Sequence, residues 1–135
     1  MNLDTADRFV TIRVSSKDAH YAGELVDGAF VMRQFGDAVT FATARELGDE
    51  GLLAAYEHVD FKLPVHPGDF ITIAVEEVSR SRLSRTFELA AIRIGKNAES
   101  PKRPSATCVS TDTGEIVATA IARSVVPLAV VKNRG

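Results

Sequence analysis

Titratable side chains gather in one short stretch, residues 15–37, which reads SSKDAHYAGELVDGAFVMRQFGD. Asp18, His20, Glu24 and Asp27 lie before or at the start of a mostly apolar segment. A carboxylate in a partly dry cleft has a raised pKa and acts as a base near neutral pH. Backbone amides at the start of a helix lack partners and stabilise negative charge on an oxygen atom. The stretch therefore combines candidate bases with a turn suited to hold an oxyanion.

The pattern of apolar residues predicts the elements that position this stretch. Apolar residues at helical spacing over 25–43 predict one long, mostly buried helix. Strands and turns follow from alternating residues and from clusters of Gly, Pro and Asp. The predicted strands are 9–14, 52–61, 70–78, 85–94, a short one at Val109, and 116–126; turns are expected at 48–51, 64–69 and 111–114, and a loop over 95–104.

An antiparallel meander has to bury one face, and a single apolar helix is suited to cover it. We therefore predict an α+β structure of the hotdog type, in which a sheet of about five to six antiparallel strands wraps one central helix. The chain of 135 residues fits one domain over 1–135, with its core at about 8–126.

Composition limits the classes of protein. Cys108 is the single cysteine, which excludes an internal disulfide and a cysteine-based zinc site. The three histidines have no ligand spacing, so we expect no metal. The first residues, MNLDTADRF, do not form a signal peptide, and no apolar run is long enough to span a membrane. These features predict a cytoplasmic protein.

Charge is unevenly distributed. Residues 80–103 hold seven basic and two acidic side chains, a net charge of +5, whereas the whole chain has a net charge of −2. One interpretation is a solvated strand pair and loop. The other is a patch that binds phosphates of a ligand. The acidic balance of the whole chain argues against nucleic acid as a partner.

Four segments, SSKDAHYAGELVDGA, FGDAVT, GDEGLLAAYEHVDF and LPVHPGDF, resemble the hotdog-fold CoA-thioester ammonia lyases, the group of β-alanyl-CoA:ammonia lyase and 3-aminobutyryl-CoA ammonia lyase. A looser resemblance extends to the hotdog acyl-CoA thioesterases. The resemblance covers about 11–94. The chain departs from the group at Glu24, where Asn is usual, at the SRSR sequence of 79–82, and beyond Gly95.

The resemblance implies reversible elimination of ammonia from a 3-aminoacyl-CoA to give the enoyl-CoA. Coenzyme A is then part of the substrate, and no further cofactor is required. It also implies a homodimer, or a tetramer or hexamer built from dimers, with sites at subunit interfaces. The candidate catalytic residues are Asp18, His20, Glu24 and Asp37; the candidates for substrate and CoA binding are Tyr21, Val26, Asp27, Gly28, Tyr56, Arg80, Arg82 and Arg85.

These candidates have specific expected roles. The thioester carbonyl would lie over the turn at 25–28, with Gly28 allowing close approach to the backbone. Asp37 lies about 15 Å along a helix from Asp27, so it would complete the site of a partner subunit. Tyr56 and His58 would share one face of a strand. The arginines would bind the phosphates of CoA.

Two other functions remain open. A hotdog thioesterase would use the same base to activate water toward the same carbonyl. A non-catalytic subunit would only bind an acyl-CoA or acyl carrier. Asp18, Glu24 and Asp37 remain alternative bases, since a lyase and a thioesterase both need a carboxylate near the thioester.

Overall fold

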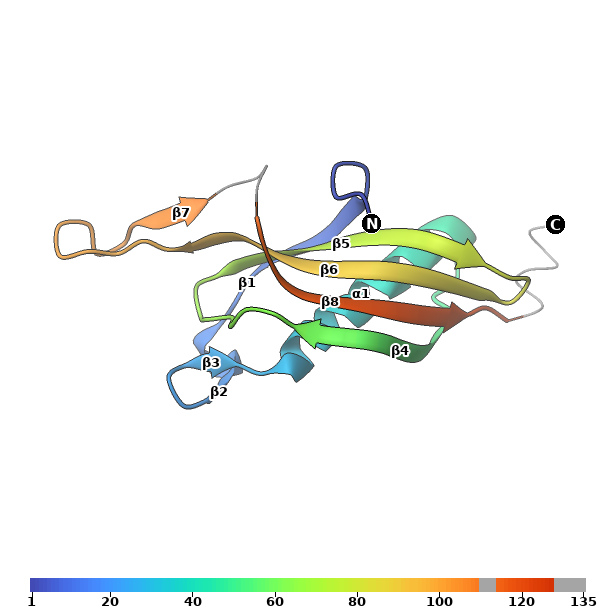
Figure 1. The fold of residues 1–135 in the computed structure, drawn as a ribbon, viewed down its shortest axis with the longest axis horizontal. Coiled ribbons are helices and arrows are strands. Elements are labelled where there is room, and N and C mark those ends of the chain that lie inside the picture. Colours follow the sequence, from blue (N-terminus) through green and yellow to red (C-terminus); the bar gives the residue numbers. More distant parts are fainter. Residues whose placement is uncertain (110–113, 128–135) are drawn as a thin grey trace.

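One helix lies across one face of an antiparallel sheet in the computed structural model, which describes residues 1–109 and 114–127 of the chain (Figure 1). The elements are β1 (Asp7–Arg13), the short 3-10 helix η1 (Ser16–Asp18), β2 (Ala19–Tyr21), β3 (Leu25–Val26), α1 (Gly28–Leu47), β4 (Leu52–Phe61), β5 (Phe70–Arg80), β6 (Ser84–Asn97), β7 (Thr107–Val109) and β8 (Glu115–Val125). In the described residues, six strands form the main sheet in the order β1-β5-β6-β8-β4, with β7 paired to β6, and β2 and β3 pair separately. The predicted α+β hotdog arrangement is confirmed.

The helix begins three residues later than predicted. Leu25 and Val26 form β3 instead, because the backbone turns back from β2 and the amide of Val26 donates to the carbonyl of Val65 at 2.9 Å. Asp27 then caps α1, since its side chain accepts a hydrogen bond from the amide of Phe30. At the other end the helix continues to Leu47 and stops at Gly48, which adopts the left-handed conformation.

The core lies between α1 and the concave face of the sheet. The helix contributes Val31, Phe35, Ala38 and Val39, all buried. They pack against residues of β5, β6 and β8 that mostly alternate along each strand, because side chains on a strand alternate between its two faces. These strand residues are Ile71, Ile73, Val75, Phe87, Leu89, Ala91, Val117, Ala118, Ala120 and Ala122.

Strand β4 forms one edge of the sheet and contains a bulge. From Glu57 to Asp60 it advances three residues while β8 advances two, and His58 at this point has a φ of 51°. The extra residue breaks the regular alternation of faces. Tyr56 faces α1, whereas His58 lines a pocket on the opposite face of the sheet. The prediction that Tyr56 and His58 share a face is therefore wrong.

The end of β6 extends away from the body of the domain (Figure 1). We predicted a loop over 95–104, but β6 continues to Asn97 and pairs there with β7. Most of the turn predicted at 111–114 lies outside the described residues.

Candidate active site

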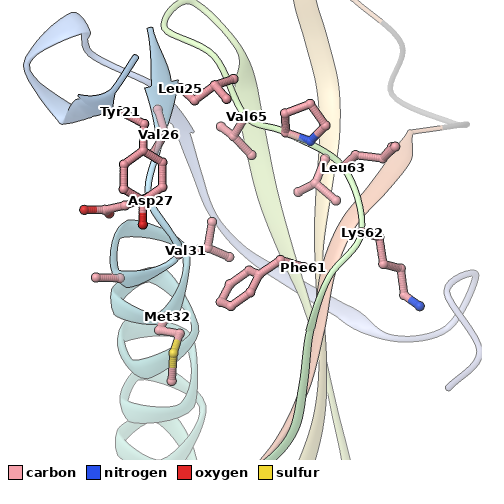
Figure 2. Close-up of a pocket in the computed structure, with 14 residues that line it drawn as sticks. Tyr21, Leu25, Val26, Asp27, Val31, Met32, Phe61, Lys62, Leu63 and Val65 are labelled. Atoms are coloured by element: carbon pink, nitrogen blue, oxygen red, sulfur yellow. The ribbon is translucent and has the colours of Figure 1, made fainter. Parts of the chain in front are cut away.

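A cavity of about 630 Å³ opens at the N-terminus of α1 (Figure 2). We call it the helix-entry pocket. One wall is β3 with the first turns of α1, and the other is the segment 61–65 that leaves β4. The lining residues are Tyr21, Leu25, Val26, Asp27, Gly28, Ala29, Val31, Met32, Phe61, Lys62, Leu63, Pro64, Val65 and Val117. The lining is largely apolar, and its polar groups are concentrated at the start of the helix.

The start of α1 presents hydrogen-bond donors to this pocket. The first amides of a helix have no partner within the helix. Phe30 donates its amide to Oδ1 of Asp27 at 3.0 Å, which leaves the amides of Gly28 and Ala29 available. Among the described residues of the lining, Asp27 carries the one carboxylate and Lys62 the one amine. A carboxylate therefore lies beside two free backbone donors at the positive end of the helix dipole.

The second wall is held in place from both sides. The amides of Lys62 and Leu63 donate to the carbonyl of Val117 at 2.8 and 3.2 Å. Arg93 of β6 donates to the carbonyl of Pro64 at 2.8 Å and pairs with Asp69 at 3.2 Å. These contacts tie the segment 61–65 to β8 and β6.

Gly28 lies against a side chain of the same chain, whereas we expected it to make room for a ligand. A methyl group added at Gly28 would lie 2.6 Å from Cζ of Phe61. The close approach that this glycine permits is therefore made by an aromatic ring of the same chain. The ring of Phe61 points across the pocket toward α1, near Val31 and Met32 (Figure 2).

None of the three candidate bases, Asp18, Glu24 and Asp37, lines the helix-entry pocket. Asp18 is half-buried in η1 and does not line the pocket. Glu24 lies in the turn between β2 and β3 with a φ of 58°, exposed, and lines a separate pocket with His66 and Arg93. The side chain of His20 lies outside what the structure describes.

Asp37 and Tyr56 lie further along the helix, near enough for the charge of Asp37 to act on Tyr56. Asp37 is exposed, since α1 buries only one face rather than being enclosed on all sides. Tyr56 of β4 donates its hydroxyl to the carbonyl of Met32 at 2.9 Å, beside Gly36. Burial, and next the charge of Asp37, raise the pKa of Tyr56 above its ordinary value. Within one chain, neither Asp37 nor Tyr56 lines the helix-entry pocket.

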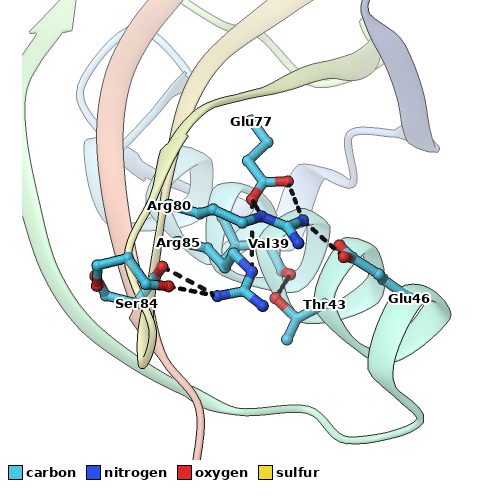
Figure 3. A network of polar contacts seen from close by, with 8 residues as sticks. Val39, Thr43, Glu46, Glu77, Arg80, Ser84 and Arg85 are labelled. Atoms are coloured by element: carbon cyan, nitrogen blue, oxygen red, sulfur yellow. Dashed lines mark hydrogen bonds and ion pairs between the residues drawn. The ribbon is translucent and has the colours of Figure 1, made fainter. Parts of the chain in front are cut away.

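Two of the predicted arginines, Arg80 and Arg85, lie in a network of polar contacts with Glu77 and, for Arg80, with Glu46 of the helix (Figure 3). Arg80 binds Glu77 at 2.8 Å and Glu46 at 2.6 Å. Glu46 lies near the C-terminus of α1, about 27 Å along the helix from Gly28. Arg80 is therefore distant from the helix-entry pocket of its own chain.

Arg82 and Arg85 lie near the β5–β6 turn. Arg85 is buried and donates to the carbonyls of Ser81 and Ser84 at 3.1 and 3.2 Å. Arg82 is exposed in the turn itself. The structure does not bring either of them to the helix-entry pocket.

Sequence reasoning missed the second wall, residues 61–65, and Met32 of the helix. Phe61 was predicted only as the end of the strand 52–61, and Pro64 and Val65 only as part of the turn 64–69. Their approach to the helix depends on hydrogen bonds to β8 and β6, which leave no local signal in the sequence.

Within residues 1–109 and 114–127, no three His, Cys, Asp or Glu side chains meet in a way that would hold a metal ion. The described helix is not long and apolar enough to cross a membrane.

The fold and pocket place the chain among hotdog proteins. It superposes on a hexameric hotdog-fold thioesterase of Campylobacter jejuni with a TM-score of 0.71 at 18% identity, over 89% of this chain and 83% of that one. It also superposes on the β-alanyl-CoA:ammonia lyase from Clostridium propionicum with a TM-score of 0.80 at 25% identity, over 92% and 87% of the two chains.

A curated relative points to the same group. The chain is 41% identical over 83 residues to the 3-aminobutyryl-CoA ammonia lyase of Acetoanaerobium sticklandii. This match covers 62% of the chain and 66% of the relative, just under two thirds of its length. No protein-family model matches the chain. The resemblance to the hotdog CoA-thioester ammonia lyases is confirmed.

Proposed function

We propose that the protein is a carbon–nitrogen lyase, which reversibly eliminates ammonia from 3-aminobutyryl-CoA or β-alanyl-CoA to give the enoyl-CoA. One observation carries this proposal: the helix-entry pocket places the carboxylate of Asp27 beside the free amides of Gly28 and Ala29. The similarity to two ammonia lyases supports it. Coenzyme A is part of the substrate, and the proposed reaction needs no other cofactor.

The proposed chemistry follows from the polarity of the pocket. The amides of Gly28 and Ala29 donate to the thioester oxygen, where negative charge develops as the neighbouring C–H bond breaks. Asp27 accepts the proton through Oδ2, because Oδ1 is held by the amide of Phe30. The electrons of the C–H bond form the C=C bond, and those of the C–N bond leave with nitrogen. The leaving nitrogen is already protonated as an ammonium group, so it departs as ammonia and no separate acid has to supply a proton.

Asp27 was placed among the candidates for substrate binding, and we now propose it as the base within one subunit. Asp37 remains the proposed contribution of a neighbouring subunit, because it is exposed beside the edge strand β4. Asp18, Glu24 and His20 would act only if assembly or substrate binding brings them closer. Arg80 and Arg82 are exposed and would likewise reach CoA from a neighbouring subunit. Arg85 is buried, so in that arrangement it would only hold the β5–β6 turn.

We propose that the whole chain, 1–135, forms one hotdog domain that assembles as a homodimer, or as a tetramer or hexamer of dimers. Strand β4 supports this, since it is an edge strand with exposed Leu52, Leu53 and Phe61. Analytical ultracentrifugation tests assembly. A monomer at micromolar concentration would contradict it. The cytoplasm is the proposed compartment, because a single cysteine requires no oxidising environment.

The test is incubation of the purified protein with crotonyl-CoA and ammonium near pH 8, with products followed by mass spectrometry and a thiol reagent in a parallel reaction. We expect 3-aminobutyryl-CoA without free thiol. Acryloyl-CoA tests for the β-alanyl product in the same way. Free CoA without an amine adduct would contradict the lyase.

A thioesterase is the second candidate. The observation that favours it is that the same pocket would polarise a thioester for attack by water, since the oxyanion donors serve both reactions. Release of free CoA would support this function. If neither product forms, binding of acyl-CoA without turnover would support a binding subunit.

A further inference from the structure

The geometry points to Phe61 as the residue that limits the length of the acyl chain in the helix-entry pocket. This inference rests on the proposed function, because it assumes that the pocket holds the acyl group of a CoA thioester. Phe61 then selects short acyl groups over long ones.

The ring of Phe61 occupies the space into which a longer chain would extend. It contacts the Cα side of Gly28, so it lies directly beside the amides proposed to bind the thioester oxygen. It points toward the helix at the level of Val31 and Met32, one turn further along α1 (Figure 2). An acyl chain that starts at these amides and follows the apolar side of the helix meets this ring.

The surroundings of Phe61 are those of a pocket wall. The side chain is 55% exposed, although a large apolar side chain usually lies in the core. Val31, Val65 and Val117, which also line the pocket, are apolar and buried. If the ring of Phe61 is removed, an alkyl group that takes its place contacts these apolar side chains. Truncation of Phe61 therefore enlarges an apolar site.

The bulge in β4 is the reason that this ring faces the helix. Tyr56 and Phe61 are separated by five positions, so a regular strand would place them on opposite faces. The extra residue at His58 restores Phe61 to the face of Tyr56, and both contact α1. The strained conformation of His58 is therefore tied to the placement of Phe61 in the pocket.

The test compares kcat/KM for ammonium addition to crotonyl-CoA and to 2-octenoyl-CoA. In the unmodified protein we expect a strong preference for crotonyl-CoA. Phe61→Ala should raise the octenoyl-to-crotonyl ratio by about tenfold or more, since even one methylene in an apolar pocket changes selectivity by this order. Phe41→Ala is the matched control. Phe41 is also exposed, at 53%, but packs against Phe9 and does not line the pocket.

An unchanged ratio in Phe61→Ala, or equal use of both substrates by the unmodified protein, would overturn the inference. Isothermal titration calorimetry with butyryl-CoA and octanoyl-CoA tests the inference independently of the proposed reaction, because binding requires no turnover. Tight binding of butyryl-CoA and gain of octanoyl-CoA binding in Phe61→Ala would support the inference even if no amine adduct forms. Failure of every acyl-CoA to bind would overturn both.

Discussion

Oδ1 of Asp27 accepts a hydrogen bond from the amide of Phe30 at 3.0 Å, so the carboxylate that lines the helix-entry pocket also caps α1. The two roles can be separated by substitution. Asn caps a helix as well as Asp does but cannot accept a proton as a base. Asp27→Asn should therefore lower kcat by about 100-fold or more, with little change in stability. Asp27→Ala should in addition lose about 1 kcal/mol of stability. Steady-state kinetics and urea denaturation measure the two effects.

Glu24→Gln is the matched control for the proposed base. It removes an exposed carboxylate from the β2–β3 turn, outside the helix-entry pocket, and we expect near-normal turnover. A loss of at least about tenfold in this variant would return the role of base to Glu24. Normal turnover in Asp27→Asn would instead move the role to Asp18 or Asp37.

The backbone conformation of Glu24 predicts that a substitution there changes the stability of the protein. Its φ of 58° places a residue with a Cβ in the left-handed region, which is costly for most side chains. Asn tolerates this region, and Asn is the residue usual here in the group that the chain resembles. Glu24→Asn should raise the free energy of unfolding by about 1 kcal/mol. Glu24→Gln keeps the strain, so an equal gain in that variant would show that backbone conformation is not the cause.

Tyr56 predicts a dependence on alkaline pH. Burial, and then the charge of Asp37, raise the pKa of Tyr56 above its ordinary value of 10.0. The folded protein holds this proton more tightly than the unfolded chain, so the stability it contributes is present below pH 10 and lost as pH rises through the folded pKa. In a Tyr21→Phe background, Tyr56 is the sole tyrosine, and tyrosinate absorbance reports its titration. Asp37→Asn should lower that pKa. An unchanged titration would exclude Asp37 as a contributor.

The ion pair of Arg93 and Asp69 predicts a large loss of stability. Their side chains are 10% and 5% exposed, and their closest N–O distance is 3.2 Å. Asp69→Asn should cost about 2 kcal/mol, because it removes one of the two carboxylates that pair with a nearly buried cation, while Glu115 stays at 3.2 Å. It should also raise KM, since Arg93 holds the pocket wall through Pro64. Lys96→Gln is the control. Lys96 is exposed and lies 3.5 Å from Glu115, so its loss should cost less than about 1 kcal/mol.

Much of the fold could be predicted because each element carries its own periodic pattern. The strand β4 was predicted with its observed bounds, and the alternating residues of β5 and β8 gave strands close to those found. The helix was predicted with its start at 25, because Leu25 and Val26 continue the apolar run. Their pairing in β3 depends on contact with Val65, which is distant in sequence.

The sequence by itself determined the long helix, most of the strands, the hotdog arrangement and the cluster of titratable residues near the helix start, because these depend on composition and local spacing. The tertiary structure decided which of those residues share a pocket. Asp27 lines the helix-entry pocket, whereas Glu24 lies on the other side of a tight turn and Arg80 lies at the far end of α1. The structure also brought in Phe61, through a bulge that shifts the alternation of β4 by one residue. Such placements depend on strand register and on contacts between distant segments, which local periodicity does not specify.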